Sequence, residues 1–184
     1  MRTSESRGTT GVCGLFMVMA LVAGCGGWVG HGDTYVRRWS PRWKVNQEAT
    51  FRVGLPPDEW RPAKQKGAQV LWIHEAVPAL IHVTAQCEMH GDSSLESFTD
   101  HLRIDFRAWE VVEQKSEVVA GRDALRSIVL AEIDGGVATK MELLVFKKNG
   151  CLFDMQYIAP PSHFERGRAA FQQVVAGFSF PVER

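Results

Sequence analysis

The sequence lacks an excess of charge of either sign. Its 184 residues include 21 lysines and arginines and 21 aspartates and glutamates. A nucleic-acid-binding domain usually carries a basic patch and a clearly positive net charge. We therefore expect no nucleic-acid partner.

Motifs of the common enzyme classes are also missing. The sequence contains no Gly-x-Ser-x-Gly, no His-Glu-x-x-His and no phosphate-binding glycine loop. Such an absence does not exclude an enzyme, but it leaves no residue to which a catalytic role can be assigned. We expect a non-catalytic protein without a cofactor.

The uncharged run at residues 11–23 is short for a membrane span. Thirteen residues rise only about 20 Å as a helix, whereas the hydrocarbon core of a bilayer is roughly 30 Å thick. Arg2 and Arg7 precede the run, and the small residues Ala23 and Gly24 end it. These features predict a signal peptide rather than a permanent span.

The end of this segment, Val22-Ala23-Gly24-Cys25, resembles the signal of bacterial lipoproteins. The resemblance implies that residues 1–24 are removed and that acyl chains such as palmitate on Cys25 anchor the protein in a membrane of the cell envelope, facing the periplasm. Gly26 stands where an aspartate would signal retention, so the resemblance implies the outer rather than the inner membrane. The alternative is an ordinary secretory signal followed by a coincidental cysteine.

The remaining 160 residues suit one domain. Loss of Arg2, Glu5 and Arg7 would leave 19 basic and 20 acidic residues. This length, in a chain with 45% hydrophobic residues, allows one buried core and is too short for two comfortable domains. We expect a tether over residues 25–47 and a single domain over residues 48–184.

Two properties of the tether are predicted. Four glycines between residues 26 and 32 favour a flexible start. Residues 35–44 then mix three aromatic residues with four cationic ones, which suits a membrane interface. Alternatively, Trp39 and Trp43 pack onto the domain as part of its core.

Alternating apolar and polar residues predict an antiparallel sheet. The expected strands are residues 49–53, 69–74, 79–89, 111–119, 124–133, 137–147 and 151–159. In the third of these, Ile81, Val83, Ala85, Cys87 and Met89 share the face that we expect in the core.

Two helices are predicted where the apolar period becomes helical. Ser93-x-x-Glu96 and Ser162-x-x-Glu165 match the capping box that begins many helices. The first apolar stripe is Leu95, Phe98, Leu102 and Phe106, with Trp109 near the helix end, and the second is Phe164, Phe171, Val174, Val175 and Phe178, with Gly177 as C-terminal cap.

The apolar faces also suggest the loops of the last two hairpins. A two-residue loop at Asn149-Gly150 would pair Phe146 with Phe153 and separate the apolar sets of the two strands onto opposite faces. A three-residue loop would keep both sets on one face. We therefore predict three-residue loops here and at residues 134–136, where Ile133 would pair with Val137.

The domain resembles the PsbP-like fold family. The resemblance rests on Phe51-Arg52-Val53-Gly54-Leu55-Pro56 with Trp60, the capped first helix, Ala120-Gly121-Arg122-Asp123-Ala124, and a final aromatic helix ending at Gly177-Phe178. It spans residues 48–181. It implies an α+β fold, an antiparallel meander between two helices, and a binding or assembly role.

Polar candidates for a metal or catalytic site are His90, Asp92, His101 and Asp105. His101 and Asp105 are one helical turn apart, and His90 and Asp92 precede that helix. Against a site, no two histidines have a recognised metal-ligand spacing, and polar residues opposite an apolar stripe usually face solvent. We expect no metal site, and His74 and His82 are weaker candidates.

The remaining cysteines suggest a disulfide. If Cys13 leaves with the signal and Cys25 is lipidated, an oxidising compartment receives only Cys87 and Cys151. A bond would close a 64-residue loop and stabilise the fold by about 4 kcal/mol in the chain-entropy model. The alternative is two separate buried thiols.

The sequence thus favours a lipid-anchored, non-catalytic envelope protein that binds a protein or lipid partner. A carrier of a small apolar ligand or lipid is the alternative, and an enzyme is a third. A carrier needs an apolar cavity, whereas an assembly module needs an exposed apolar patch.

Overall fold

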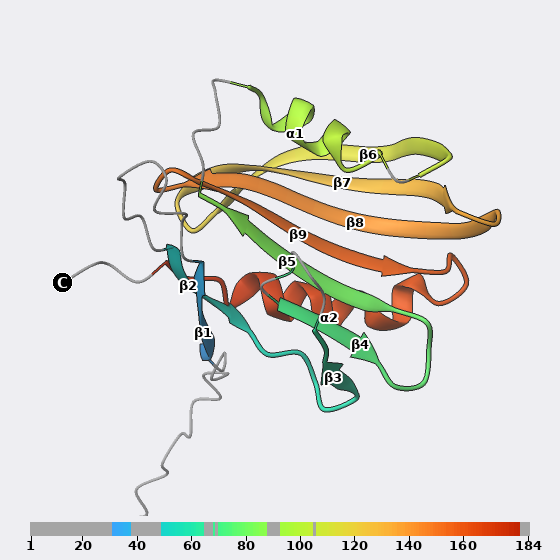
Figure 1. Cartoon of the computed structure of the whole chain (residues 1–184), viewed down its shortest axis with the longest axis horizontal. Helices are drawn as coiled ribbons and strands as arrows, with labels where there is room; N and C mark the ends of the chain where they lie inside the picture. The colour runs from blue at the N-terminus through green and yellow to red at the C-terminus, as the bar shows by residue number, and fades with distance from the viewer. Residues whose placement is uncertain are drawn as a thin grey trace, which may run out of the picture.

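The alternating segments form strands in a computed structural model, which describes residues 31–37, 49–64, 68, 70–87, 93–104 and 106–180. Seven strands pair antiparallel in the order β3-β4-β5-β9-β8-β7-β6, and β1 pairs with β2 separately (Figure 1). The elements are β1 (His31–Arg37), β2 (Ala49–Gly54), β3 (Trp60–Pro62), β4 (Val70–His74), β5 (Leu80–Gln86), α1 (Leu95–His101), β6 (Ala108–Val119), β7 (Arg122–Ile133), β8 (Val137–Lys148), β9 (Cys151–Ala159) and α2 (Phe164–Ala176).

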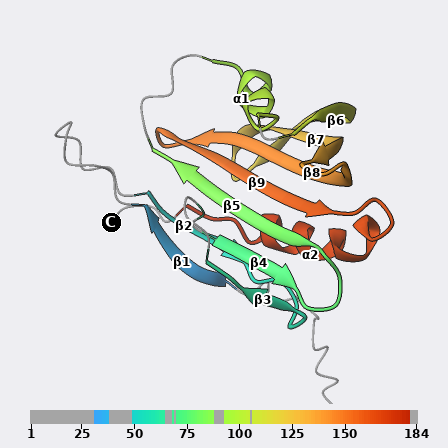
Figure 2. The same ribbon diagram turned by 45° about the vertical axis from the view of Figure 1, so that its right-hand side comes forward.

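The two helices lie on opposite faces of the large sheet (Figures 1 and 2). α2 contacts β9 and β2 on one face, and α1 contacts β7 and β8 on the other. Each face has its own buried apolar cluster, and the cluster under α1 consists of Val129, Ala131, Met141 and Leu143. The predicted fold class, an antiparallel meander flanked by two helices, is confirmed.

The predicted loop between β8 and β9 is wrong. Phe146 pairs with Phe153, and only Asn149 and Gly150 lie between the strands. Their φ angles of 50° and 74° suit a two-residue hairpin turn with both central residues left-handed, a conformation that asparagine and glycine tolerate. The three-residue loop predicted between β7 and β8 is confirmed, because Ile133 pairs with Val137.

The error follows from the two-sided burial of β8. Leu144 and Phe146 belong to the cluster on the α2 face, while Met141 and Leu143 belong to the cluster under α1. The predicted loop assumed a single buried face. The observed register places the predicted apolar set of β9 on the α2 face and Met141 and Leu143 of β8 on the α1 face. Because both faces are covered, neither set is exposed to water.

Both predicted capping boxes are wrong. The side chain of Ser94, not Ser93, caps α1 by accepting a hydrogen bond from the Ser97 amide at 3.2 Å. At α2 the N-cap is His163, without a side-chain cap bond. The apolar stripe of α2 and its C-cap at Gly177 are as predicted.

The first helix is also shorter than predicted. α1 ends at His101, and Trp109 lies in β6. Leu102, Phe106 and Trp109 nevertheless pack against the cluster under α1. Their helix-like spacing therefore reflects a shared packing partner rather than one continuous helix.

Two strands were not expected from the sequence. His31–Arg37, inside the predicted tether, pairs antiparallel with β2 as strand β1. Trp60–Pro62 forms the short edge strand β3 against β4. Its proline stands at a sheet edge, where a missing amide donor is tolerated.

Cys87 and Cys151 form a disulfide. Cys87 directly follows β5 and Cys151 begins β9, and these two strands are neighbours. Their α-carbons are 4.0 Å apart, well inside the roughly 7 Å beyond which a bridge requires backbone movement. The predicted pair is bonded, and both residues belong to the core on the α2 face.

The end of α2 contacts β2 closely enough to require glycine. A Cβ at Gly177 would overlap the backbone of Gly54, and a Cβ at Gly54 would overlap the carbonyl of Gln173. Two backbone hydrogen bonds between Arg52 and Ser179, of 2.8 and 2.9 Å, hold the segments at this separation.

We predict that Gly54→Ala and Gly177→Ala each lower the free energy of unfolding by about 1–3 kcal/mol, because each methyl group must displace backbone. Denaturant unfolding measures the change. The control is Ala169→Ser, on the exposed side of α2, which should shift stability by no more than about 0.5 kcal/mol. Wild-type stability in both glycine variants would contradict the close packing.

Candidate functional site

Most of the residues considered from sequence for a metal or catalytic site lie outside the described residues, namely His90, Asp92 and Asp105, and so does the predicted lipidation site Cys25. His101 is exposed at the end of α1. Within the described part of the chain, no three His, Cys, Asp or Glu side chains are grouped to hold a metal ion.

The two weaker histidine candidates occupy ordinary positions in the sheet. His74 accepts a hydrogen bond at Nδ1 from the Ala76 amide at 3.0 Å, and its ring lies edge-on to Trp60. His82 is partly buried in β5, and burial lowers its pKa below the usual value. His82 is therefore neutral at pH 7.

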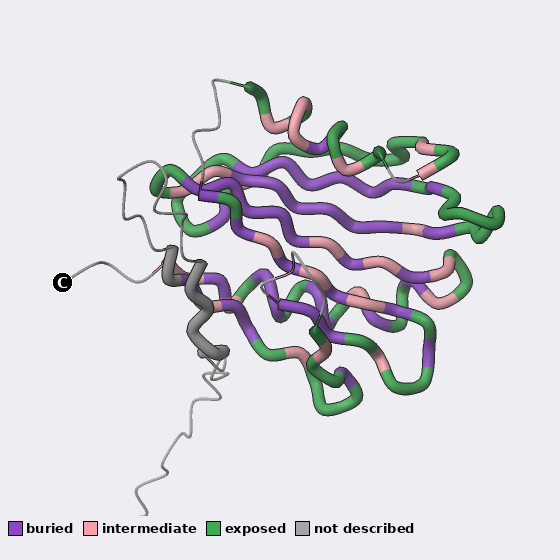
Figure 3. The backbone as a smooth tube through the Cα atoms, viewed as in Figure 1, coloured by how far each residue is buried: buried purple, intermediate pink, exposed green. Residues whose placement is uncertain are grey.

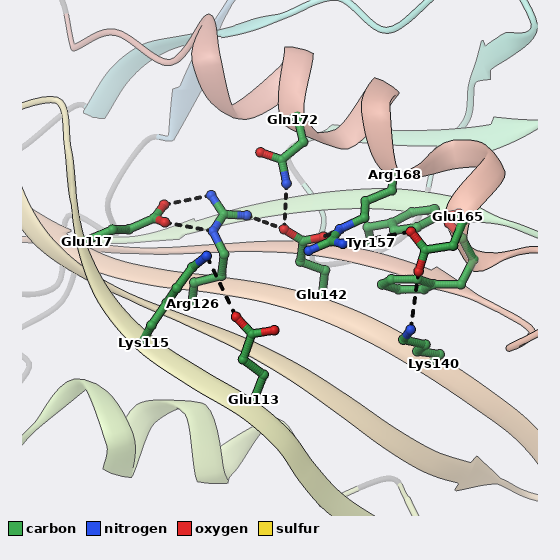
Figure 4. Close-up of polar contacts among 11 residues, drawn as sticks. Glu113, Lys115, Glu117, Arg126, Lys140, Glu142, Tyr157, Glu165, Arg168 and Gln172 are labelled. Carbon is green, nitrogen blue, oxygen red and sulfur yellow. Dashed lines mark hydrogen bonds and ion pairs between the residues drawn. The ribbon is translucent and has the colours of Figure 1, made fainter.

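The structure brings together a different set of charged residues, the ion-pair network of Glu117, Arg126, Glu142, Arg168 and Gln172 (Figure 4). Three consecutive strands, β6, β7 and β8, supply the first three residues, and α2 supplies the last two. The network therefore joins the sheet to the helix that covers it.

Glu142 is the centre of this network, and its side chain is completely buried. Arg126 Nη1 and Gln172 Nε2 both donate to Oε1, the second at 2.7 Å, and Arg168 Nε donates to Oε2 at 2.8 Å. Burial of an isolated carboxylate would cost several kcal/mol. Two cations and three hydrogen bonds offset that cost.

Arg126 connects Glu142 to the strand at the sheet edge. Its Nε and Nη2 donate to the two carboxylate oxygens of Glu117 at 2.8 and 2.6 Å, the paired geometry that guanidinium favours. The hydrogen bonds from Arg126 lower the pKa of Glu117. Burial opposes the charge of Arg126, but its bonds to Glu117 and the charge of Glu142 outweigh burial and raise its pKa.

The network reaches solvent at the first turn of α2. Hydrogen bonding to Glu142 raises the pKa of Arg168, whose Nη1 also lies 3.8 Å from Glu165. Glu165 accepts a hydrogen bond from Lys140 Nζ at 3.3 Å. Lys140 in turn stands over the ring of Phe164, 4.3 Å from its centroid.

Tyr157, next to this network, is held in its protonated form. Its buried hydroxyl donates to the Phe164 carbonyl at 2.8 Å. Burial raises the pKa of Tyr157 to about 12. A Cβ at Gly167 would lie 2.6 Å from the hydroxyl oxygen, so this helix position leaves room for the ring.

The arrangement is suited to fastening α2 rather than to reacting with a substrate. Two glutamates and two arginines give the network no net formal charge, and both carboxylates are occupied by donors from the chain itself. A general base needs an oxygen within reach of a substrate proton. In this network the oxygens contact guanidinium and amide groups.

Sequence reasoning missed this network, although a signal was present. Arg126 and Glu142 are single charges within the otherwise apolar stretches of β7 and β8, at positions that the strand alternation assigns to one face. A lone charge in a buried strand usually has a buried partner. Their link to α2 was not visible, since Arg168 is 26 residues from Glu142.

Comparison with known proteins shows which fold the chain has but assigns the chain to no family. No family model matches the chain, and no curated protein matches its sequence. Within the described residues, no helix is both long and apolar enough to span a membrane.

The solved structures that are similar to this chain include three from different bacteria. LpqN, a protein involved in cell envelope biogenesis of Mycobacterium tuberculosis, matches with a TM-score of 0.55 and 12% identity over 81% of this chain and 91% of LpqN. A Bacteroides thetaiotaomicron protein matches with a TM-score of 0.54 and 12% identity over 84% of this chain and 50% of its own length. PsbP of the cyanobacterium Synechocystis sp. PCC 6803 has a TM-score of 0.49 and 13% identity, covering 87% and 99%. At these identities the similarities show the fold alone.

We predict that Glu142→Gln lowers the free energy of unfolding by about 3 kcal/mol, mainly because Arg126, whose side chain is 8% exposed, loses one of the two carboxylates that compensate its charge. Denaturant unfolding at neutral pH measures this loss. The matched control is Glu132→Gln, at an exposed position of the neighbouring strand β7, with an expected change of less than about 0.5 kcal/mol. Equal effects of the two substitutions would contradict a structural role of the network.

The lowered pKa of Glu117 predicts a pH-dependent contribution. Its charged form is stabilised in the folded state, so the contribution is complete above the ordinary value of 4.5 and disappears as the pH falls through the lower folded pKa. At pH 7, Glu117→Gln should be less stable than wild type by about 1 kcal/mol. Unfolding at a series of pH values should show this difference shrinking below pH 4.5, and a constant difference would disprove the link to Glu117 ionisation.

Proposed function

We propose that the protein is a non-catalytic component of a bacterial cell envelope, anchored by lipid on Cys25 and displaying a domain that binds a protein or lipid partner. The uncharged run at residues 11–23, followed by Ala23, Gly24 and Cys25, supports the anchor. Two or more acyl chains hold a protein stably at a membrane, whereas one holds it marginally.

The pairing of the cysteines is the observation that carries this proposal. The chain has four cysteines. Cys13 belongs to the predicted signal, and Cys87 and Cys151 are bonded to each other. Cys25 is therefore the one thiol left for modification in the predicted mature chain, and the disulfide suits an oxidising compartment.

Two further observations support the proposal. The carboxylates of the ion-pair network contact donors of the chain itself, which favours a structural rather than a catalytic role. LpqN, which shares the fold, is described as involved in cell envelope biogenesis. Because Gly26 replaces an aspartate retention signal, we place the anchor in the outer membrane of a two-membrane cell.

Labelling of cells with a fatty-acid analogue tests the anchor. We expect label in the wild-type protein and none in Cys25→Ala, because the modified thiol is removed. The matched control is the double variant Cys87→Ala and Cys151→Ala, which removes two other cysteines and should keep its label. Equal labelling of wild type and Cys25→Ala would exclude lipidation at this position.

Cross-linking in native membranes tests the binding role separately. The wild-type chain is cross-linked, purified under denaturing conditions and compared with Cys25→Ala, which should lose envelope partners if the anchor positions the domain. Recovery of a specific protein or lipid from wild type supports the proposal. Recovery of neither would count against a partner-binding role.

A further inference from the structure

The exposed strand at the edge of the large sheet is the surface for which the structure suggests a partner. β6 has twelve residues and, among the described strands, pairs only with β7. Nearly its whole length is exposed, in contrast to β7 and β8 (Figure 3). A strand paired on one side leaves backbone N–H and C=O groups available to another strand.

A bulge limits which part of β6 another strand can join. The pairing of β6 with β7 shifts between Val111 and Glu113, and such a shift bends the strand and interrupts regular pairing. From Glu113 to Val119 the register continues without a break. The regular half of β6 is therefore the part suited to strand addition.

The charges on this half are complementary to themselves. Glu113, Lys115 and Glu117 project from one face of β6, with alternating sign. In an antiparallel pair of identical strands, a two-fold axis passes through one residue, which then stands opposite its own copy. An axis at Lys115 would oppose two lysines, and an axis at Glu117 would oppose two glutamates, which is unfavourable.

Axes at Gln114 and Ser116 avoid these repulsions, as do axes at Val118 or Val119, but the last two leave at most residues 117–119 of β6 to pair. An axis at Gln114 would pair Glu113 with Lys115, but it brings the bulge at residues 111–113 into the new ladder. An axis at Ser116 pairs Lys115 of each copy with Glu117 of the other and uses only the regular half. It also places Val118, which is 70% exposed, against Gln114 of the second copy.

We propose that two copies of this chain associate through antiparallel pairing of their β6 strands, with the two-fold axis at Ser116. The two sheets then continue into one another. Lys115, whose Nζ lies 3.7 Å from Glu113 Oε1 in the single chain, then stands opposite Glu117 of the other copy, whose carboxylate also accepts from Arg126, and this alternation of charge favours the register. The register is specific, because axes at Lys115 or Glu117 bring like charges together and an axis at Gln114 brings the bulge into the new ladder.

This inference concerns the folded domain and does not require the lipid on Cys25. The two proposals can therefore fail independently. Loss of fatty-acid label would leave β6 pairing intact, and a monomeric chain would leave the anchor intact.

Cysteine cross-linking of the full-length chain carrying Cys13→Ala and Cys25→Ala, purified in detergent and treated with a mild oxidant, tests the register, because Cys87 and Cys151 are bonded to each other and only the introduced thiol is free. Ser116→Cys places two thiols on the two-fold axis, within the reach of cross-strand neighbours. We expect a covalent dimer on a non-reducing gel. Glu110→Cys, at an exposed position of the same strand before the bulge, is the control for random collision and should give little dimer.

Charge reversal tests the reason for the register. Adding Lys115→Glu to Ser116→Cys places glutamate opposite Glu117 twice, and the cross-linked dimer should fall roughly tenfold. Adding Arg103→Glu, an equal charge change at an exposed position near α1, should leave it unchanged. The proposal is overturned if Ser116→Cys gives no dimer, if Glu110→Cys or Gln114→Cys cross-links as well, or if both charge reversals act equally.

Discussion

Both faces of β8 are covered by other parts of the chain. Met141 and Leu143 lie under α1, while Leu144 and Phe146 face the core on the side of α2. If either apolar face stayed in water, the fold would lose the favourable free energy of burying it, roughly 25 cal/mol per Å² of apolar surface. The placement of one helix on each face, and the two-residue turn at Asn149-Gly150 that sets the register of β9, both satisfy this requirement.

The accuracy of prediction from sequence depended on how many faces of a strand are buried. In β5, Ile81, Val83 and Ala85 are fully buried and the residues between them are not, so alternation identified the core face and the inward side of Cys87. In β8 both sets are apolar, and alternation could not decide between two loop lengths. The Asn-Gly pair was the better guide, since its two residues tolerate the left-handed conformation.

The charged residues show a second limit of sequence analysis. Alternation places Arg126 and Glu142 within buried strands, and this is visible without a structure. The partners on α2 are not, because the spacing of Arg168 and Gln172 says nothing of which strand the helix crosses. The capping boxes mark a limit of local motifs. A serine does cap α1, but it is Ser94 rather than the adjacent Ser93, and the N-cap His163 of α2 makes no side-chain cap bond.

The ion-pair network extends to the edge at which two-sided burial ends. β6 buries little of its own surface, but side-chain contacts supplement its backbone pairing with β7: Trp109 packs under α1, and Gln114 Nε2 donates to Ser127 Oγ at 3.0 Å. Glu117 attaches β6 most firmly, since its carboxylate accepts from two of the Arg126 donors, while a third Arg126 donor bonds Glu142 and through it α2. The Glu117 carboxylate therefore has two effects. It stabilises the fold through Arg126, and it keeps β6 ordered, so that the charges along this edge strand have fixed positions. Pairing of an ordered edge strand with another strand costs less conformational entropy than pairing of a frayed one. In β6 the backbone and the side chain of Glu117 are already ordered before a second strand binds.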